Sequence, residues 1–543
     1  MKPNFIKQSF SIQHSLFSIL FLLLISILSA AEKKQPNVII FLTDDQEWRN
    51  FNFLPEGKDK DGKARNLTPN LDKMVEEGVV FTRNYSNSSV CTPSRYNILT
   101  GSYASRAHGV NVSKDGMVRV EWNTHIYKDT PTLQKTLAEN NIQTAMVGKN
   151  HVIKSSKLQK IKRDDDIKDP IILEKLKQNQ IEIIKAIHDT GFHYASHIYN
   201  SNIPINAPKT MEDHNLEWIL QGGKQFLKQK EDRPYFLYFP ITMNHGPHRY
   251  RAWKGNPLST PVGPLKEKPG GIAKREELAA KVKAAGLPEE QVDLTYMDAI
   301  LGALFQEIKD RGEADNTVVF LLTDHGVNNA SKGHLYDGGT RSPLVVWGPG
   351  YFSGGKIKKS IVQTLDLAPT ILELMNIEKP TNLQFDGKSI LPLLKDEKEE
   401  IHESIALEIG ISRAIVKGKY KYLTIREPQD IKELTREGRQ ALLDKTIKFH
   451  KEVEGRDHHN HDPMAPFGHM GKVPGSTHAT SQLMKRKPTY FDIDQLYDLE
   501  KDPSERKNLA KLPEYATLLK SMQSEMSKSL SKMPGEFAEF TDK

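Results

Sequence analysis

The feature that most constrains the fold is an alternation of buried-strand and amphipathic-helix patterns between residues 36 and 395. Val38 to Leu42 is a continuous apolar run, which predicts a strand covered on both faces. A helix pattern begins at Pro69 and ends before Gly78, the usual places for proline and glycine at helix ends. The alternation continues with expected strands 79–85, 144–147, 235–239 and 318–322 and expected helices 129–141, 212–231 and 291–310. This order predicts an α/β fold, with helices on both faces of a mainly parallel sheet.

Acidic residues directly follow two of these strands. The first strand leads into Asp44 and Asp45, and the last leads into Asp324 and His325. Because ligands gather at the carboxyl ends of parallel strands, we expect these side chains to share one site. Crowded carboxylates repel one another unless a cation or a shared proton intervenes, and hard oxygen ligands suit calcium or magnesium. Helix capping would explain one such pair alone, whereas two pairs in matching positions favour a metal.

Cys91 is the only cysteine of the 543 residues. Thr92 and Pro93 follow it and predict a helix start, which places Cys91 at a helix N-terminus, where backbone N–H groups favour anions. Arg95 falls one turn further and can point its guanidinium at the same anion. A free thiolate in such a place would be reactive, so we interpret Cys91 as a reactive site rather than a structural thiol.

The segment around Cys91 resembles the signature of the type I sulfatases, in the residues Cys91-Thr92-Pro93-Ser94-Arg95 and Leu99-Thr100-Gly101. Other family motifs are resembled by residues 148–151, 244–248, 332–341, 366–370 and 496–503. Three positions depart from the usual family pattern: Asn244 replaces a proline, Asp337 a glutamate, and His325 the asparagine of many members. The resemblance implies an alkaline-phosphatase-like fold and a sulfuric ester hydrolase, consistent with a bacterial carbohydrate sulfatase.

The resemblance also implies the chemistry of the site. In this family an activating enzyme, of the formylglycine-generating or sulfatase-maturing kind, oxidises the cysteine to formylglycine. The hydrated aldehyde carries two hydroxyls, of which one attacks sulfur and the other later expels sulfate. A bound Ca²⁺, with Mg²⁺ as the alternative, lowers the pKa of the attacking hydroxyl.

Residue roles follow from the matching motif positions. The implied metal ligands are Asp44, Asp45, Asp324 and modified Cys91; direct coordination by His325 stays open, because imidazole is not a preferred calcium ligand. Arg95 and Lys149 would hold the hydrate and the sulfate, and His151 would take the hydrate proton. His245 and Lys332 would contact sulfate and protonate the leaving oxygen.

Three functions are compatible with these residues. A sulfated polysaccharide or oligosaccharide is the expected substrate, and the alternatives are hydrolysis of phosphate mono- or diesters or phosphonates, or a non-catalytic glycan-binding relative. The last alternative should have lost part of the Cys, Lys, His and Asp set, which is present here. The formal charge of +7 suits an anionic substrate, and the absence of a basic stripe interleaved with aromatics argues against nucleic acid.

The N-terminus predicts export. Lys2 and Lys7 precede an apolar run, residues 16–28, and small residues follow it at 29–31. Residues 1–31 therefore resemble a secretory signal peptide, with a mature protein in the periplasm or outside the cell. The alternative, a membrane anchor, needs a span of roughly 20 apolar residues, so we expect no stable membrane anchor.

Two domains are expected after the signal. Residues 32–395 should form the catalytic domain, and residues 396–543 a smaller one with an antiparallel sheet, where residues 412–425 predict a hairpin that turns at Gly418. The His-rich residues 450–478 fit no standard zinc spacing. They form either a solvated loop, the preferred interpretation, or a loop that reaches over the active site to a polyanionic substrate. The charged residues 154–169 are expected to be a solvated insertion.

Overall fold

The computed structural model describes residues 34–537, apart from 123, 204–206, 230, 456, 459 and 470–476. The expected signal peptide, residues 1–31, lies outside the described residues. Among the helices that are described, none has the length and apolar character needed to cross a bilayer.

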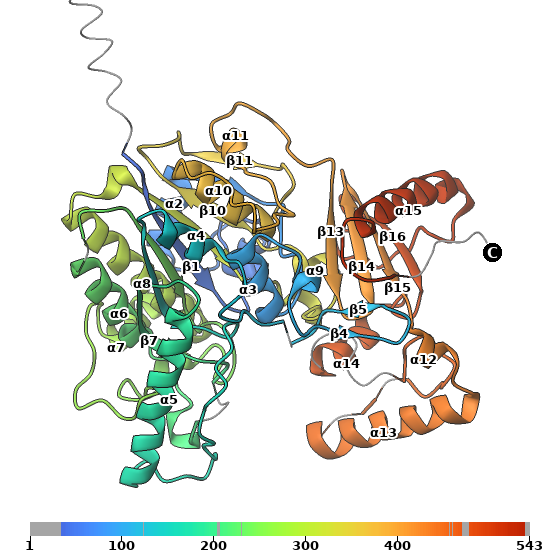
Figure 1. Ribbon diagram of the computed structural model, residues 1–543, viewed down its shortest axis with the longest axis horizontal. Helices are drawn as coiled ribbons and strands as arrows, with labels where there is room; N and C mark the ends of the chain where they lie inside the picture. Colours follow the sequence, from blue (N-terminus) through green and yellow to red (C-terminus); the bar gives the residue numbers. More distant parts are fainter. Residues whose placement is uncertain are drawn as a thin grey trace, which may run out of the picture.

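An eight-stranded sheet organises the larger part of the molecule (Figure 1). Its strands are, in spatial order, β11 (Lys356–Lys358), β2 (Val79–Phe81), β10 (Leu344–Trp347), β9 (Thr317–Thr323), β1 (Asn37–Thr43), β8 (Tyr235–Pro240), β6 (Gln143–Lys149) and β7 (Tyr194–Tyr199). Strand β1 pairs in parallel with both β8 and β9, whereas β10 runs antiparallel to β9 and β2. The sheet is mainly parallel, and the predicted fold class is confirmed.

Helices cover both faces of this sheet, because successive side chains of its strands point to opposite sides. Val38, Ile40 and Leu42 of β1 lie in one apolar core, and Ile39 and Phe41 lie in the other. The first core is covered by α3 (Cys91–Thr100), α4 (Leu133–Glu139), α5 (Pro170–His188) and α10 (Leu367–Leu374). The second is covered by α2 (Pro69–Glu77), α6 (Leu216–Lys228), α7 (Arg275–Ala284) and α8 (Val292–Asp310).

A second, antiparallel sheet lies towards the C-terminus, as expected. It contains β13 (Ser404–Ile409), β14 (Ser412–Lys417), β15 (Tyr420–Ile425) and β16 (Asp494–Asp498), and α15 (Ala516–Leu530) packs on it. The predicted hairpin is β14–β15, with Gly418 in its turn at a φ of 53°. Residues of β13 and β14 share one continuous apolar core with β1, so the expected boundary between 395 and 396 stays a prediction.

The remaining elements are short or peripheral. They are β3 (Asn84–Tyr85) paired with β12 (Val362–Gln363), β4 (Asn111–Val112) paired with β5 (Val118–Arg119), α9 (Asp337–Thr340), α11 (Leu391–Leu394), α12 (Gln429–Lys432), α13 (Arg436–Glu454) and α14 (Thr477–Arg486). The expected single strand 79–85 is two strands in different sheets, because the chain turns at Thr82 and Arg83.

The two stretches expected to be solvated differ from that expectation in part. Residues 154–169 are mostly accessible, but Ile161 is buried against α5. In the His-rich stretch, His450, His458 and His469 are buried, and the Nδ1 atoms of His450 and His458 lie 2.9 Å apart. The prediction of a solvated loop is therefore wrong for these three histidines. His450 lies in α13, and His458 contacts it. The carbonyl oxygen of His469 accepts from Oγ1 of Thr446, another residue of α13, at 3.0 Å.

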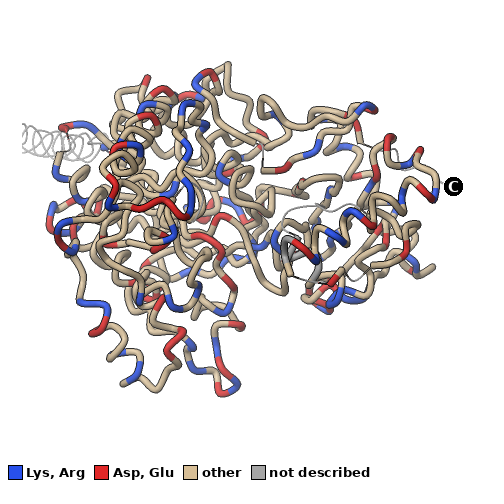
Figure 2. Tube along the Cα trace, turned by 90° about the horizontal axis from the view of Figure 1, so that it is seen from below, with Lys and Arg blue, Asp and Glu red and all other residues tan. Residues whose placement is uncertain are grey.

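Charge is distributed over the whole molecule rather than gathered on one side. Figure 2 shows basic and acidic residues interspersed along the chain in both parts of the molecule. Long-range attraction of an anionic substrate therefore depends on local groups near the site rather than on a field of one sign.

Candidate active site

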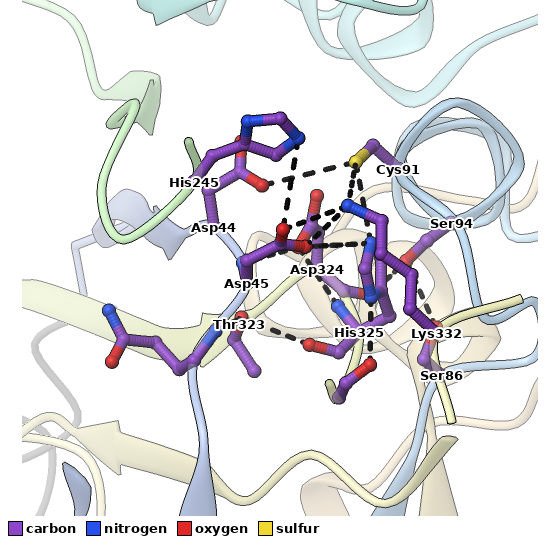
Figure 3. A network of polar contacts seen from close by, with 12 residues as sticks. Asp44, Asp45, Ser86, Cys91, Ser94, His245, Thr323, Asp324, His325 and Lys332 are labelled. Carbon is purple, nitrogen blue, oxygen red and sulfur yellow. Dashed lines mark hydrogen bonds and ion pairs between the residues drawn. The ribbon is translucent and has the colours of Figure 1, made fainter. Parts of the chain in front are cut away.

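The predicted site residues converge from separate elements at the carboxyl edge of the main sheet (Figure 3). In the parallel pairing of β1 and β9, Thr43 lies opposite Thr323, so the acidic residues that follow both strands are neighbours. Lys149 ends β6, and His245 lies in the loop after β8. Cys91 and Arg95 come from α3, and Lys332 and His151 come from loops after η8 (Asn328–Ala330) and β6.

Cys91 is the first residue of α3 and is fully buried. Its Sγ lies 3.3 Å from Nε2 of His325 and 3.9 Å from both Oδ1 of Asp44 and Nζ of Lys332. Burial raises the pKa of the thiol well above its ordinary value, and Lys332 and Lys149 offset only part of that rise. An unmodified Cys91 thiol would therefore be neutral at pH 7.

Three carboxylates and three cations form a compact buried cluster around Cys91. The Nη2 atom of Arg95 lies 3.2 Å from Oδ2 of Asp44 and 3.2 Å from Oδ2 of Asp324, so it links the ends of β1 and β9. Lys149 forms an ion pair with Asp44. Lys332 donates to both carboxylate oxygens of Asp45, at 2.8 Å each.

These partners keep Asp44 and Asp45 ionised despite their burial. Burial by itself would raise the pKa of Asp44, but Lys149, His245 and Arg95 lower it to about 2. Lys332 leads the groups that overcome burial at Asp45 and hold its pKa well below the ordinary value. The cluster therefore presents anionic oxygens at neutral pH, which is the form that binds a hard cation.

Backbone carbonyl oxygens orient two histidines of the site, His325 and His245. Nδ1 of His325 lies 3.0 Å from the carbonyl oxygen of Gly326 and donates to it, which directs Nε2 toward Oδ1 of Asp45, 3.4 Å away. Nδ1 of His245 likewise donates to the carbonyl of Gly246, at 2.7 Å. Burial, followed by Lys332, lowers the pKa of His245 to about 4.

Among the described residues, His151 forms no hydrogen bond with Cys91, although it follows Lys149 by only two residues. Burial, followed by Lys149 and Arg95, lowers its pKa well below the ordinary value. Its Nδ1 is buried and has no hydrogen-bond partner among the described residues, and its ring centroid is 6.2 Å from that of Trp122. A neutral imidazole with an unengaged nitrogen suits a proton acceptor.

A glycine positions Lys149. Gly148 has a φ of 112°, and the register of β6 against β7 shifts between Val147 and Gly148. A Cβ atom at Gly148 would lie 2.0 Å from the carbonyl oxygen of Pro240 in β8. Only glycine permits this local bulge, which directs Lys149 toward Asp44.

A cleft of about 890 Å³ opens above the cluster, with Asp45, His245 and Lys332 in its lining. Its walls include residues that the sequence analysis did not single out: Trp48, Trp122, Asn202, Arg249, Gln482 and Arg486. Asn202 also accepts from Nζ of Lys149 at 2.6 Å, so it belongs to the site itself. It follows β7, an edge strand. Half of the side chains of β7 are partly exposed, so its sequence lacks the continuous apolar run that predicts a buried strand.

The comparison with protein families decides the identity of this arrangement. The family model described as Sulfatase matches residues 36–377, well over half of the chain. This chain belongs to the sulfatase family. The match confirms the predicted family and the predicted class, a sulfuric ester hydrolase. All the proposed site residues lie within the matched region.

Individual relatives are distant from this sulfatase. The human N-acetylgalactosamine-6-sulfatase is 25% identical over 387 residues, which cover 66% of each chain, so the alignment spans about two thirds of that relative. An ulvan-active sulfatase of Formosa agariphila is 22% identical over 536 residues, 92% of this chain and 75% of the relative.

Solved structures extend the similarity over nearly the whole chain. A 6S-sulfatase from a study of glycosaminoglycan metabolism in Bacteroides thetaiotaomicron has a TM-score of 0.59 at 17% identity and covers 92% of this chain and 100% of its own. At this identity the likeness shows the fold, including the C-terminal antiparallel sheet. The roles of the individual site residues stay predictions.

Proposed function

We propose that this sulfatase hydrolyses sulfate esters of a sulfated oligosaccharide or polysaccharide, with Cys91 as the attacking residue after its conversion to formylglycine. The convergence on Cys91 carries the proposal: His325, Asp44 and Lys332 contact its Sγ at 3.3, 3.9 and 3.9 Å from three different elements. A sugar substrate is supported by the names of the relatives, N-acetylgalactosamine-6-sulfatase and ulvan-active sulfatase. The wide cleft with Trp48 and Trp122 in its walls fits a sugar ring.

The modification matters because a neutral, buried thiol is a poor nucleophile. Formylglycine would supply two hydroxyls on one carbon, one to attack sulfur and one to release sulfate, and it implies a maturing enzyme as a partner during biosynthesis. Around it, the cations Lys149 and Lys332 would bind the sulfate, and His151, whose lowered pKa favours the neutral imidazole, would accept a proton.

A divalent cation fits the donor set. Asp44, Asp45, Cys91 and His245 each offer an atom to a group that lies within 4.8 Å, and Cys91 shares a second such group with Asp324 and His325. Three carboxylates are already balanced by Arg95, Lys149 and Lys332, so a cation would make the site net positive, which suits a sulfate ester. The cation would lower the pKa of the attacking hydroxyl and neutralise sulfate oxygens.

We favour Ca²⁺ over Mg²⁺, because the donors are oxygen-rich and irregularly arranged. His325 could join them through Nε2, since its Nδ1 is fixed as a donor by Gly326. We further propose export, with cleavage after residues 1–31; N-terminal sequencing of exported protein that still showed Met1 would contradict it.

The metal proposal is tested by Asp45→Ala and by chelation. Removing one carboxylate should lower both bound metal, measured by elemental analysis, and sulfate release, the latter by roughly a hundredfold or more. Asp61→Ala, at an exposed turn, is the matched control and should leave both unchanged. Full sulfate release in chelator, with no metal bound, would end the proposal.

A further inference from the structure

Helix α14 belongs to the C-terminal part of the chain (Figure 1), and two of its residues line the cleft. The helix packs against η8, next to the loop that carries Lys332. Gln482 and Arg486 are four residues apart, so they lie on one face of α14, and both line the cleft. The cleft therefore has one wall from a segment more than one hundred residues beyond the matched family region.

The neighbouring face of α14 is anchored firmly. Leu483 is fully buried in the main apolar core. One turn later, Nζ of Lys487 donates to the carbonyl oxygen of Glu505 at 3.0 Å and lies 4.1 Å from the centroid of the Tyr336 ring. This anchoring fixes the side of the helix that faces the cleft, so Gln482 and Arg486 have a defined place in its wall.

Arg486 differs from the other cations of the cleft. Lys332 pairs with Asp45 at 2.8 Å, and Arg49 and Arg249 share Glu47, at 2.5 and 3.2 Å. Arg486 is exposed, and within the part of the chain that the structure describes it has no ion pair or hydrogen bond. A guanidinium in this state is available to bind a carboxylate or a sulfate through two parallel hydrogen bonds.

The cleft has room for more than the scissile group. Its volume of about 890 Å³ lies near the upper end of the range for sites that hold ligands of drug size. Asp45, His245 and Lys332 line it from the cluster around Cys91, and Gln482 and Arg486 line it from α14. A cleft of this volume can hold a neighbouring sugar as well as the one that carries the scissile sulfate.

We propose that Arg486, assisted by the amide of Gln482, binds a second acidic group of the substrate, a carboxylate or a further sulfate. This sulfatase then prefers glycans that carry at least two anionic groups over substrates with one. The inference rests on the proposed function, because it assigns the specificity of the same site. Arg486 thus determines specificity, whereas the cluster around Cys91 carries out the reaction.

The test compares selectivity between matched substrates. Sulfate release is measured from a monosulfated disaccharide with a uronate carboxylate, from its carboxyl-reduced counterpart, from a disulfated neutral disaccharide, and from 4-nitrophenyl sulfate. The variants are Arg486→Ala and Arg486→Lys. Lys485→Ala is the matched control, since it removes an equal, exposed charge from the adjacent position of α14 that does not line the cleft.

In Arg486→Ala, the ratio of kcat/KM for a substrate with two anionic groups to that for its counterpart with one should fall roughly ten- to hundredfold, through KM. Arg486→Lys should recover part of the ratio, and Lys485→Ala should keep it. Whether the carboxylate or the second sulfate shows the effect identifies the acidic group.

An unchanged ratio in Arg486→Ala, or an equal loss in Lys485→Ala, would overturn the inference while the proposed function stands. Wild-type protein that releases sulfate from none of the four substrates would overturn the proposed function, and the inference with it.

Discussion

In the residues around Cys91, burial and ion pairing set different protonation states within one site. The Cys91 thiol is held neutral, whereas Asp44 and Asp45 are held ionised by Lys149 and Lys332. His151 and His245 are both neutral, but only His151 keeps a buried nitrogen without a partner among the described residues. These differences support His151 as proton acceptor and leave proton donation to His245 or Lys332.

Substitution of the two histidines separates these roles. His151→Ala and His245→Ala should each lower turnover by roughly two to four orders of magnitude if one accepts and the other donates a proton. With a good leaving group such as nitrophenol, the loss in His245→Ala should shrink, because that oxygen needs little protonation. Equal losses on nitrophenyl sulfate and on a sulfated sugar would assign the donor role to Lys332 instead.

At the scale of elements, the bulge at Gly148 in β6 determines where the side chain of Lys149 lies. Gly148→Ala should destabilise the protein by roughly 2–4 kcal/mol, because the new Cβ meets the carbonyl of Pro240, and turnover should fall roughly a hundredfold as Lys149 shifts. Denaturant unfolding and sulfate release measure the two effects.

Gly62→Ala is the control for this substitution. Gly62 also has a positive φ, of 78°, but no atom lies within 4 Å of its added Cβ. Its cost should be about 1 kcal/mol, with turnover unchanged. Equal effects of the two substitutions would show that the clash with β8 does not position Lys149.

The elements also show what the sequence could and could not reveal. Strands β1 and β9 were predicted to within two residues, because continuous apolar runs are unambiguous when both faces are buried. The acidic pairs that follow them met as expected, since parallel register places them together. Helix α14 was missed, because it is short, polar and embedded in a Gly- and His-rich stretch.

The cleft walls were missed for a different reason. Arg486 lies in a segment whose path is set by tertiary packing, and no local pattern near it predicts a place in the cleft wall. Arg249 directly follows the motif at 244–248, but it is not part of the resemblance. The burial of His458 and His469 likewise depends on their contacts with α13, through His450 and Thr446.

At the scale of the whole molecule, a buried ionic cluster joins the catalytic part to the C-terminal sheet. Nζ of Lys421 in β15 lies 2.5 Å from Oδ1 of Asp337 in α9 and 3.1 Å from Oε1 of Glu505, and all three side chains are buried. Asp337 lies five residues after Lys332, so this cluster ties the C-terminal sheet to a loop of the active site.

Lys421→Met should destabilise the protein by roughly 3–5 kcal/mol, because two buried carboxylates lose their main partner. Lys419→Met removes an accessible cation of the same hairpin and should change the free energy of unfolding little. Denaturant unfolding of both variants measures the difference, and a Lys421→Met protein as stable as wild type would show that the junction does not depend on this cluster.

The central claim is that Cys91, in modified form, cleaves sulfate esters. The most direct measurement is sulfate release from a panel of sulfated oligosaccharides by wild type, Cys91→Ala and Cys91→Ser, with mass spectrometry of the peptide that contains residue 91. We predict aldehyde in place of thiol in active wild-type protein, no turnover in Cys91→Ala, and at most a trapped sulfate ester in Cys91→Ser, since one hydroxyl can attack but cannot eliminate. Turnover at the wild-type rate by protein that carries only an unmodified thiol at position 91 would contradict the account.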